Sequence, residues 1–455
     1  MKTLLKILYG LFFALLFPLF LAWWSSVVVV PFPAIHLPAA GFSCAGVGLM
    51  ILLVGMWTLT RKGEGLPMNA FPPSKLVTQG IYRVLPHPIY FGFVVACLGG
   101  SVGFGSATGL WLTTPLALIL CGTLVIGYER PFLLAKHHAL PKPILRFGLL
   151  WGPLASLLRL NVLWNAVLRF SEKVANSWRF RRIGRLRIIN HGIYGGLAGG
   201  VGAFLTVWLS GGHVLSISII LMAGLIGAGI WAQVLEGSSV LLRPFGYYGG
   251  VLGIALGTLG VWWFDPSVWL ILGAFAFAGP WIQGIGRIRC LIQGCCHGRL
   301  ASQTAGIKVT NPHSRVCALD HLHDRPIYPT QLYSILGNVV IGLFLIWLWL
   351  VQAPLTLIVG SYLILSGCAR FMEEAYRGEP QTRRMFCLPI YQWLAIGCVL
   401  AGMLVMTANA GPAPGIGASS LVLACMTGGS FLLVCWFALG MDFPESKAMF
   451  SRLSG

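Results

Sequence analysis

The chain has 455 residues, of which 57% are apolar and only 9% charged, and its mean hydropathy is +0.81. These values exclude a soluble globular protein and indicate a polytopic membrane protein. The formal net charge of +19 is expected of loops that stay cytoplasmic or contact anionic lipid, and no soluble segment offers the basic, aromatic-rich face that nucleic-acid binding requires.

Long apolar runs of about the 20 residues that a bilayer core requires recur along the whole chain. We expect them to be helices, because backbone groups in lipid must be satisfied internally. The first run is too long for a signal peptide and lacks a small-residue cleavage site, so we expect an uncleaved span. The fold class is thus all-α, with about twelve transmembrane helices in two bundles, at 4–30, 39–58, 88–105, 108–127, 191–210, 213–235, 246–264, 267–286, 332–351, 354–371, 388–408 and 417–440.

Residues 136–190 differ from the rest because arginines alternate there with Trp and Leu at helical spacing. This pattern predicts an amphipathic helix on the membrane surface, with a solvated basic linker as the alternative. We therefore expect a first domain at 1–135, a basic amphipathic connector at 136–190, a second domain at 191–440 and a tail at 441–455.

Counting spans and placing basic loops inside puts the N-terminus, the connector and the 287–331 loop in the cytoplasm. The predicted orientation of the second domain reverses if 144–170, where three arginines interrupt the apolar residues, is itself a span.

The loop at 61–92 carries the first motif, PPSKLVTQGIYRVLPHPIYFG. It resembles the PPxxLVxxGxYRxxRHPxYxG segment of the isoprenylcysteine carboxyl methyltransferase and phospholipid methyltransferase superfamily, which helps to bind S-adenosylmethionine. The matching residues are Pro72, Pro73, Leu76, Val77, Gly80, Tyr82, Arg83, His87, Pro88, Tyr90 and Gly92.

The resemblance implies that Arg83, His87, Tyr90 and Glu129 bind S-adenosylmethionine. The family's Arg before His-Pro is Pro86 here, so the cation for the cofactor carboxylate must be Arg83, Arg130 or Lys136. An active methyltransferase and a degenerate domain kept for lipid or partner binding both stay open.

Four polar motifs follow in the second half: GYYGGVLG at 246–253, GRIRCLIQGCCHG at 286–298, YPTQLY at 328–333 and RFMEE at 370–374. Charged residues beside a bilayer are costly and mark a working site. Two arginines converging from different helices form a natural clamp for a phosphodiester, because the planar guanidinium matches phosphate oxygens. The alternative for these arginines is snorkelling from the span ends toward the interface.

Over about 191–408 these motifs resemble prolipoprotein diacylglyceryl transferase. The resemblance implies a bacterial inner-membrane enzyme that transfers the diacylglyceryl group of phosphatidylglycerol, or of another anionic phospholipid, to a thiol while glycerol phosphate leaves. That family works from the outer face of the membrane, opposite to the charge-based topology. No cofactor is implied for this half. The implied substrate-binding residues are Arg287, Arg370, Arg377, Gly249, Gly250, Gln293 and Gln331.

The acid–base residues of that family are replaced here. Tyr248 stands in place of its His, Cys290 in place of its Asn and Cys295 in place of its Glu. Because thiol activation needs a base, His297 is the candidate substitute, and an activated Cys295 or Cys296 acting as nucleophile is the alternative. The candidate catalytic residues are His297, Cys295, Glu374 and Tyr248.

The acceptor stays open between a protein thiol, a small molecule and a lipid. The rival functions are a non-catalytic phospholipid-binding or maturation factor, and a lipid methyltransferase whose second half only binds lipid. A transporter would show inverted repeats, which this sequence lacks.

Eight thiols and imidazoles crowd the segment from 290 to 323. A structural metal, a disulfide and reduced thiols lining a lipid site are the alternatives, and because a regular zinc-ligand spacing is missing we assign no metal ligand. The residues are Cys290, Cys295, Cys296, His297, His313, Cys317, His321 and His323.

Overall fold

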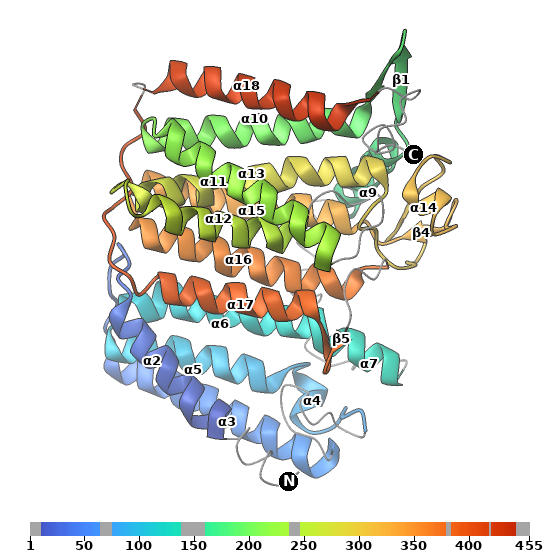
Figure 1. The fold of residues 1–455 in the computed structure, drawn as a ribbon. Coiled ribbons are helices and arrows are strands. Elements are labelled where there is room, and N and C mark those ends of the chain that lie inside the picture. The colour runs from blue at the N-terminus through green and yellow to red at the C-terminus, as the bar shows by residue number, and fades with distance from the viewer. Residues whose placement is uncertain are drawn as a thin grey trace. The chain divides into compact units, whose positions relative to one another are not determined.

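The computed structural model describes residues 11–63, 75–137, 160–235, 246–378, 384–417 and 420–442. It divides into two units, Met1–Asn161 and Val162–Gly455 (Figure 1). Among the described residues, eight helices are long and apolar enough to cross a membrane, and four shorter apolar helices accompany them. Each of these overlaps one of the expected spans, which confirms the all-α polytopic fold class.

The first unit is a helical bundle in which glycines allow close contact. A Cβ on Gly48 would lie 2.5 Å from the backbone nitrogen of Ala96, and one on Gly99 would lie 2.3 Å from that of Ala45. Small residues at such crossings let two membrane helices approach to backbone contact. Its elements are η1 (Phe12–Leu16), α2 (Phe17–Val27), α3 (Pro38–Gly63), α4 (Ile81–Val84), α5 (Pro88–Phe104), η3 (Gly109–Thr113), α6 (Thr114–Leu124), η4 (Val125–Glu129) and α7 (Arg130–His137).

The second unit is a larger bundle with α13 and α16 at its centre, where 61% and 72% of their apolar stretches are buried. The helix α10 pairs with α18, and α11 with α12 (Figure 1). Its helices are α9 (Leu160–Ala175), α10 (Asn190–Ser210), α11 (Val214–Ile230), η5 (Trp231–Leu235), α12 (Tyr247–Val261), α13 (Val268–Gln293), α14 (Arg315–Ala318), α15 (Thr330–Leu350), α16 (Leu355–Tyr376), α17 (Ile390–Val405) and α18 (Leu421–Gly440).

Short strands lie at one end of this bundle. They are β1 (Phe180–Ile183), β2 (Leu186–Ile189), β3 (Ile307–Lys308), β4 (Pro326–Ile327), β5 (Arg384–Met385), β6 (Leu388–Pro389) and β7 (Met441–Asp442). The strands β1 and β2 form a hairpin across a turn at Gly184, and β7 pairs with β2. The expectation of helix in the connector is therefore wrong for 180–189: the turn glycine and the β-branched Ile residues favour strands.

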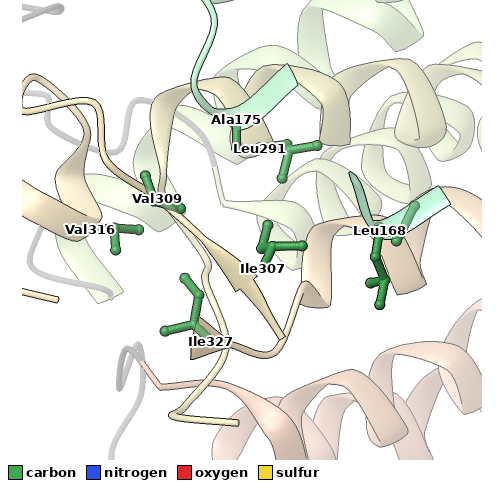
Figure 2. Packing of buried hydrophobic residues seen from close by; sticks show 8 residues of the cluster. Leu168, Ala175, Leu291, Ile307, Val309, Val316 and Ile327 are labelled. Carbon is green, nitrogen blue, oxygen red and sulfur yellow. The ribbon is translucent and has the colours of Figure 1, made fainter. Parts of the chain in front are cut away.

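A small apolar core lies at the same end of the bundle (Figure 2). We call this end of the second unit, with the short strands, α9 and the segment between α13 and α15, the cap. The helix α9 contributes Leu168 and Ala175, α13 contributes Leu291, and the segment between α13 and α15 supplies Ile307, Val309, Val316 and Ile327. One side of α9 thus packs on protein, whereas Val162, Leu163 and Phe170 of the same helix are exposed. Residues 138–159 lie outside the described residues, and the described remainder of 144–170 belongs to this amphipathic helix, which is not among the candidate spans.

The Lys and Arg residues of the second unit are segregated along its axis. Every one that the structure describes lies in the cap or in the helix ends that meet it. The opposite loops, at 211–213, 262–267, 351–354 and 406–417, contain no Lys or Arg. Such segregation is typical of a fixed orientation in a membrane.

Candidate functional site

Three arginines meet one carboxylate where α13 and α16 reach the cap. Arg287 Nη2 on α13 lies 3.0 Å from Glu373 Oε1, and Arg370 Nη1 on α16 lies 2.9 Å from the same oxygen. The Nε atom of Arg377, the residue that ends α16, lies 3.6 Å from it. Arg370 and Glu373 are both buried. The predicted convergence of arginines from two helices is therefore present in the structure.

The acidic residue at the centre of this cluster is Glu373, which sequence reasoning missed. Glu374 lies at its edge, with Oε2 3.3 Å from Arg377 Nη1 and 3.8 Å from Arg370 Nη2. Both glutamates lie one helical turn from Arg370, so spacing alone does not separate them. Only the contact with Arg287 on a second helix distinguishes Glu373.

Two tyrosine side chains lie next to the arginine cluster. The Arg370 guanidinium lies 5.2 Å from the ring centroid of Tyr391, a cation–π contact. Tyr248, the predicted catalytic tyrosine, packs its ring against Tyr391 and donates a 3.1 Å hydrogen bond to the Tyr391 carbonyl. It therefore lies beside the residue that holds Arg370. Arg370 Nε is buried and has no hydrogen-bond partner among the described residues, which leaves a donor for a ligand.

The turn after α13 is held from both sides. Thr330 Oγ1 donates to the Cys296 carbonyl at 2.7 Å, and Gln331 Nε2 donates to the Cys295 carbonyl at 2.8 Å. On the other side, the Gly378 amide donates to the His297 carbonyl at 3.0 Å. The polar residues of YPTQLY thus fix the backbone of the cysteine pair.

Cys296 adopts φ 58° within this turn. A left-handed conformation of a residue other than glycine stores strain and is typical of functional sites.

Three thiols gather in the turn: the sulfur atoms of Cys290, Cys295 and Cys296 lie within 4.8 Å of one another. Hydrogen bonds from Cys290 and Cys295 lower the pKa of the Cys296 thiol well below its ordinary value; burial opposes this, and Arg377 and Arg287 reinforce it. Hydrogen bonds with Cys290 and Cys296, and burial, raise the pKa of Cys295. The direction of the shift therefore distinguishes Cys296 from Cys295, the catalytic candidate taken from the sequence.

His297 is turned away from the thiols. Its Nδ1 lies 2.9 Å from the Gly298 carbonyl and its Nε2 lies 3.0 Å from Asp320 Oδ2. Both ring nitrogens are thus in contact with oxygen atoms of Gly298 and Asp320, and the role of His297 as a base stays a prediction.

Arg179 of the connector is a second residue that the sequence left unassigned. Its guanidinium donates to the carbonyls of Ile292 and Gln293, the last residues of α13. These carbonyls have no partner inside the helix, so the buried arginine caps it. The Gln293 side chain accepts a 3.5 Å contact from the Cys295 thiol. Its burial is evident only from the structure, because the sequence does not distinguish Arg179 from the other arginines of the connector.

The glycines of GYYGGVLG act in helix packing. A Cβ on Gly249 would lie 2.3 Å from that of Trp231 and 2.4 Å from the Gly227 carbonyl oxygen. A Cβ on Gly250 would make ordinary contacts. The structure therefore places Gly249 where α12 meets α11, and its predicted role in substrate binding stays a prediction.

In the first unit, three of the four predicted cofactor residues meet. The Tyr90 hydroxyl donates to Glu129 Oε1, and His87 Nδ1 lies 3.5 Å from Glu129 Oε2. Glu129 ends the π-helical turn η4, and such turns are frequent at functional sites. Arg83 is exposed on α4, outside this contact group. Residues 64–74, which include Pro72 and Pro73, lie outside the described residues.

Comparisons with known proteins agree with both resemblances. Residues 37–138 match the phospholipid methyltransferase family model, and 207–408 match that of prolipoprotein diacylglyceryl transferase. A phosphatidylglycerol–prolipoprotein diacylglyceryl transferase 2 of Clostridium perfringens is 30% identical over 190 residues, covering 39% of this chain and 69% of that protein. A phosphatidylglycerol–prolipoprotein diacylglyceryl transferase of Clostridium tetani is 24% identical over 207 residues, covering 42% and 79%. Through its second unit, the chain belongs to the prolipoprotein diacylglyceryl transferase family.

Proposed function

We propose that the second unit transfers a diacylglyceryl group from phosphatidylglycerol to a thiol acceptor. The observation that carries the proposal is the buried cluster of Arg287, Arg370 and Arg377. Two carboxylates, Glu373 and Glu374, accompany these three guanidiniums. The cluster thus has one positive charge in excess, which suits a singly charged phosphodiester.

The same cluster supports the chemistry of the transfer. The acceptor thiol gives its proton to a base or to solvent, and its sulfur forms a bond to the glyceryl carbon. The bond from that carbon to the phosphate oxygen breaks, and its electron pair leaves with glycerol phosphate. Negative charge therefore develops on a phosphate oxygen as the bond breaks. Guanidiniums held in place before the reaction stabilise that charge more than they stabilise the bound lipid, which lowers the barrier.

Reconstitution tests this function directly. The full-length protein is placed in vesicles of labelled phosphatidylglycerol with a peptide that carries one cysteine in a lipobox, and mass spectrometry detects the thioether-linked diacylglyceryl group. A peptide with serine at that position is the control. Phospholipid binding without any transfer would support a non-catalytic lipid-binding factor instead.

We also propose that the first unit binds S-adenosylmethionine. The residues fit the cofactor: Arg83 offers an exposed cation for its carboxylate, and Glu129, oriented by Tyr90 and His87, offers an acceptor for its amino or hydroxyl groups. When bound, the cofactor would supply an electrophilic methyl group.

We expect S-adenosylmethionine to bind the full-length protein in an isothermal titration, and His87→Ala to weaken that binding. His87→Ala removes the polar contact that orients Glu129, and a loss of about 0.5–1.5 kcal/mol, as for one hydrogen bond, corresponds to roughly 2- to 10-fold. His36→Ala is the matched control, because His36 is an exposed histidine of the same unit away from Glu129. No heat of binding to the wild-type protein would leave a degenerate domain as the better account.

For the orientation in the membrane, we propose that the cap of the second unit faces the cytoplasm of a bacterium. The segregation of Lys and Arg supports this. We expect an impermeant maleimide to leave the exposed Cys387 of the β5–β6 turn unlabelled in intact spheroplasts. The matched probe is Trp263→Cys at the opposite end, where Trp263 is 90% exposed, and it should be labelled. The reverse pattern would place the site on the outer face.

A further inference from the structure

The three-thiol turn after α13 is the feature that the proposed function leaves unexplained. Phosphodiester recognition by the arginines does not need thiols, yet Cys290, Cys295 and Cys296 meet beside Arg287. Of the twelve cysteines of the chain, all of them described, only these three form a group close enough to bind a metal ion. We propose that Cys290, Cys295 and Cys296 bind one Zn²⁺ ion, and that the fourth coordination position takes the acceptor thiol. The second part of this inference rests on the proposed transferase function.

The dimensions of the turn suit zinc. A Zn–S bond of about 2.3 Å in a tetrahedral site places the sulfurs roughly 3.8 Å apart. The three sulfur atoms lie within 4.8 Å of one another, so they reach these distances by a movement of at most about 1 Å. Thiolate ligands also favour zinc over magnesium or calcium, which prefer oxygen.

The turn is held in place before any ion binds. Cys290 lies in the last turn of α13, which Arg179 caps, and hydrogen bonds from Thr330 and Gln331 hold the carbonyls of the other two cysteines. Partners of this kind orient ligands and raise metal affinity.

No fourth protein ligand is evident among the described residues. His297, the adjacent imidazole, is hydrogen-bonded at both nitrogens to Gly298 and Asp320. Zinc sites with three protein ligands keep the fourth position for water or substrate and are typical of catalysis, whereas structural sites are closed. The open position makes this arrangement a reactive one.

Coordination of the acceptor thiol at the open position would replace the missing base. A thiol that coordinates Zn²⁺ loses its proton to solvent and stays a nucleophile. The zinc-bound sulfur then forms the bond to the glyceryl carbon, the carbon–oxygen bond to phosphate breaks, and glycerol phosphate leaves with the electron pair. The thioether product is neutral and a weaker ligand, so water replaces it. The ion thus supplies the activation that the replaced His and Glu residues no longer provide.

Metal binding is measured first, without reference to activity. Reduced, chelator-treated full-length protein in detergent is titrated with Zn²⁺ against a competing chelator, and with Co²⁺ to record sulfur-to-metal charge-transfer absorption. We expect one ion per chain. Each of Cys290→Ser, Cys295→Ser and Cys296→Ser should weaken binding by more than ~100-fold, since even a lost second-shell partner costs about 10- to 100-fold.

Cys317→Ser is the matched control, because the Cys317 thiol bonds to the Val309 carbonyl outside the three-thiol turn. It should bind the ion as the wild type does. A second measurement needs no variant: Zn²⁺ should protect the three cysteines of the wild-type protein from iodoacetamide, as read by peptide mass spectrometry, and should leave Cys387 reactive.

The outcomes separate the inference from the function on which it rests. Transfer by metal-free protein, or transfer unchanged in the three serine variants, would overturn the role of zinc in activating the acceptor thiol and leave the transferase intact, and the absence of a bound ion in the titration would overturn the zinc site itself. One bound ion without any transfer would support the metal site and overturn the transferase. A disulfide between two of these cysteines in freshly isolated protein, with no ion bound after reduction, would also overturn the zinc site.

Discussion

We expect Arg287→Ala to lower the rate of diacylglyceryl transfer at low phosphatidylglycerol concentration by about 10- to 100-fold, because a charge-assisted hydrogen bond of roughly 1.5–3 kcal/mol is lost. Arg287→Lys should recover little of this, since an ammonium cannot match two phosphate oxygens at once. The measurement is kcat/KM in the vesicle assay, together with the binding of phosphatidylglycerol to each variant.

Arg181→Ala serves as the control for that experiment. Arg181 is an exposed arginine of the β1–β2 hairpin whose guanidinium stacks on Trp178, so it lies in the basic cap but away from Glu373. Its replacement should leave the rate within about 2-fold, as for other exposed charges. If Arg181→Ala and Arg287→Ala reduced transfer equally, general attraction of anionic lipid would explain the effect and the clamp would be wrong.

We expect Glu373→Ala to be the most destabilising single substitution in the site. It removes the carboxylate that contacts Arg287, Arg370 and Arg377. Breaking a buried ion pair by removing one partner costs about 3–5 kcal/mol, because the other charge stays buried and uncompensated. The measurement is thermal or denaturant unfolding of the full-length protein in detergent. Glu373→Gln should be intermediate, since the amide keeps hydrogen-bond acceptance and loses the charge.

Glu374→Ala is the natural comparison, because Glu374 is adjacent and similarly enclosed but does not contact Arg287. Its loss should destabilise less than that of Glu373. An equal or larger effect at Glu374 would make Glu374, the glutamate chosen from the sequence, the main acidic partner of the arginines.

The spans were predictable because the bilayer imposes length and hydropathy on every helix, but two helix ends were placed too early. The expected span 267–286 is part of α13, which continues to Gln293, and the expected span 354–371 is part of α16, which continues to Tyr376. In both helices the hydropathy falls at the first arginine of the site. The helix nevertheless continues, because the buried ion pairs offset the cost of the charges.

The site was predictable in its residue types and less so in its contacts. The motifs identified Arg287 and Arg370, whereas the choice of Glu373 depends on how α16 is rotated toward α13. The thiol group was not predictable from spacing either, because one member lies in a helix and two lie in a turn with left-handed residues at Gly294 and Cys296. The cap was missed because its strands have only two to four residues each.

The pairing of β2 with β7 links an early segment of the second unit to its last described one. Arg187 and Asp442 reinforce the pairing with an ion pair, so residues 186–189 and 441–442 are neighbours. A domain with adjacent ends can be joined to another protein at either end without stretching its own fold. This closure gives a physical reason why a gene for such a unit tolerates fusion to an upstream methyltransferase-like bundle, and it suggests that 162–442 can be transplanted as a module.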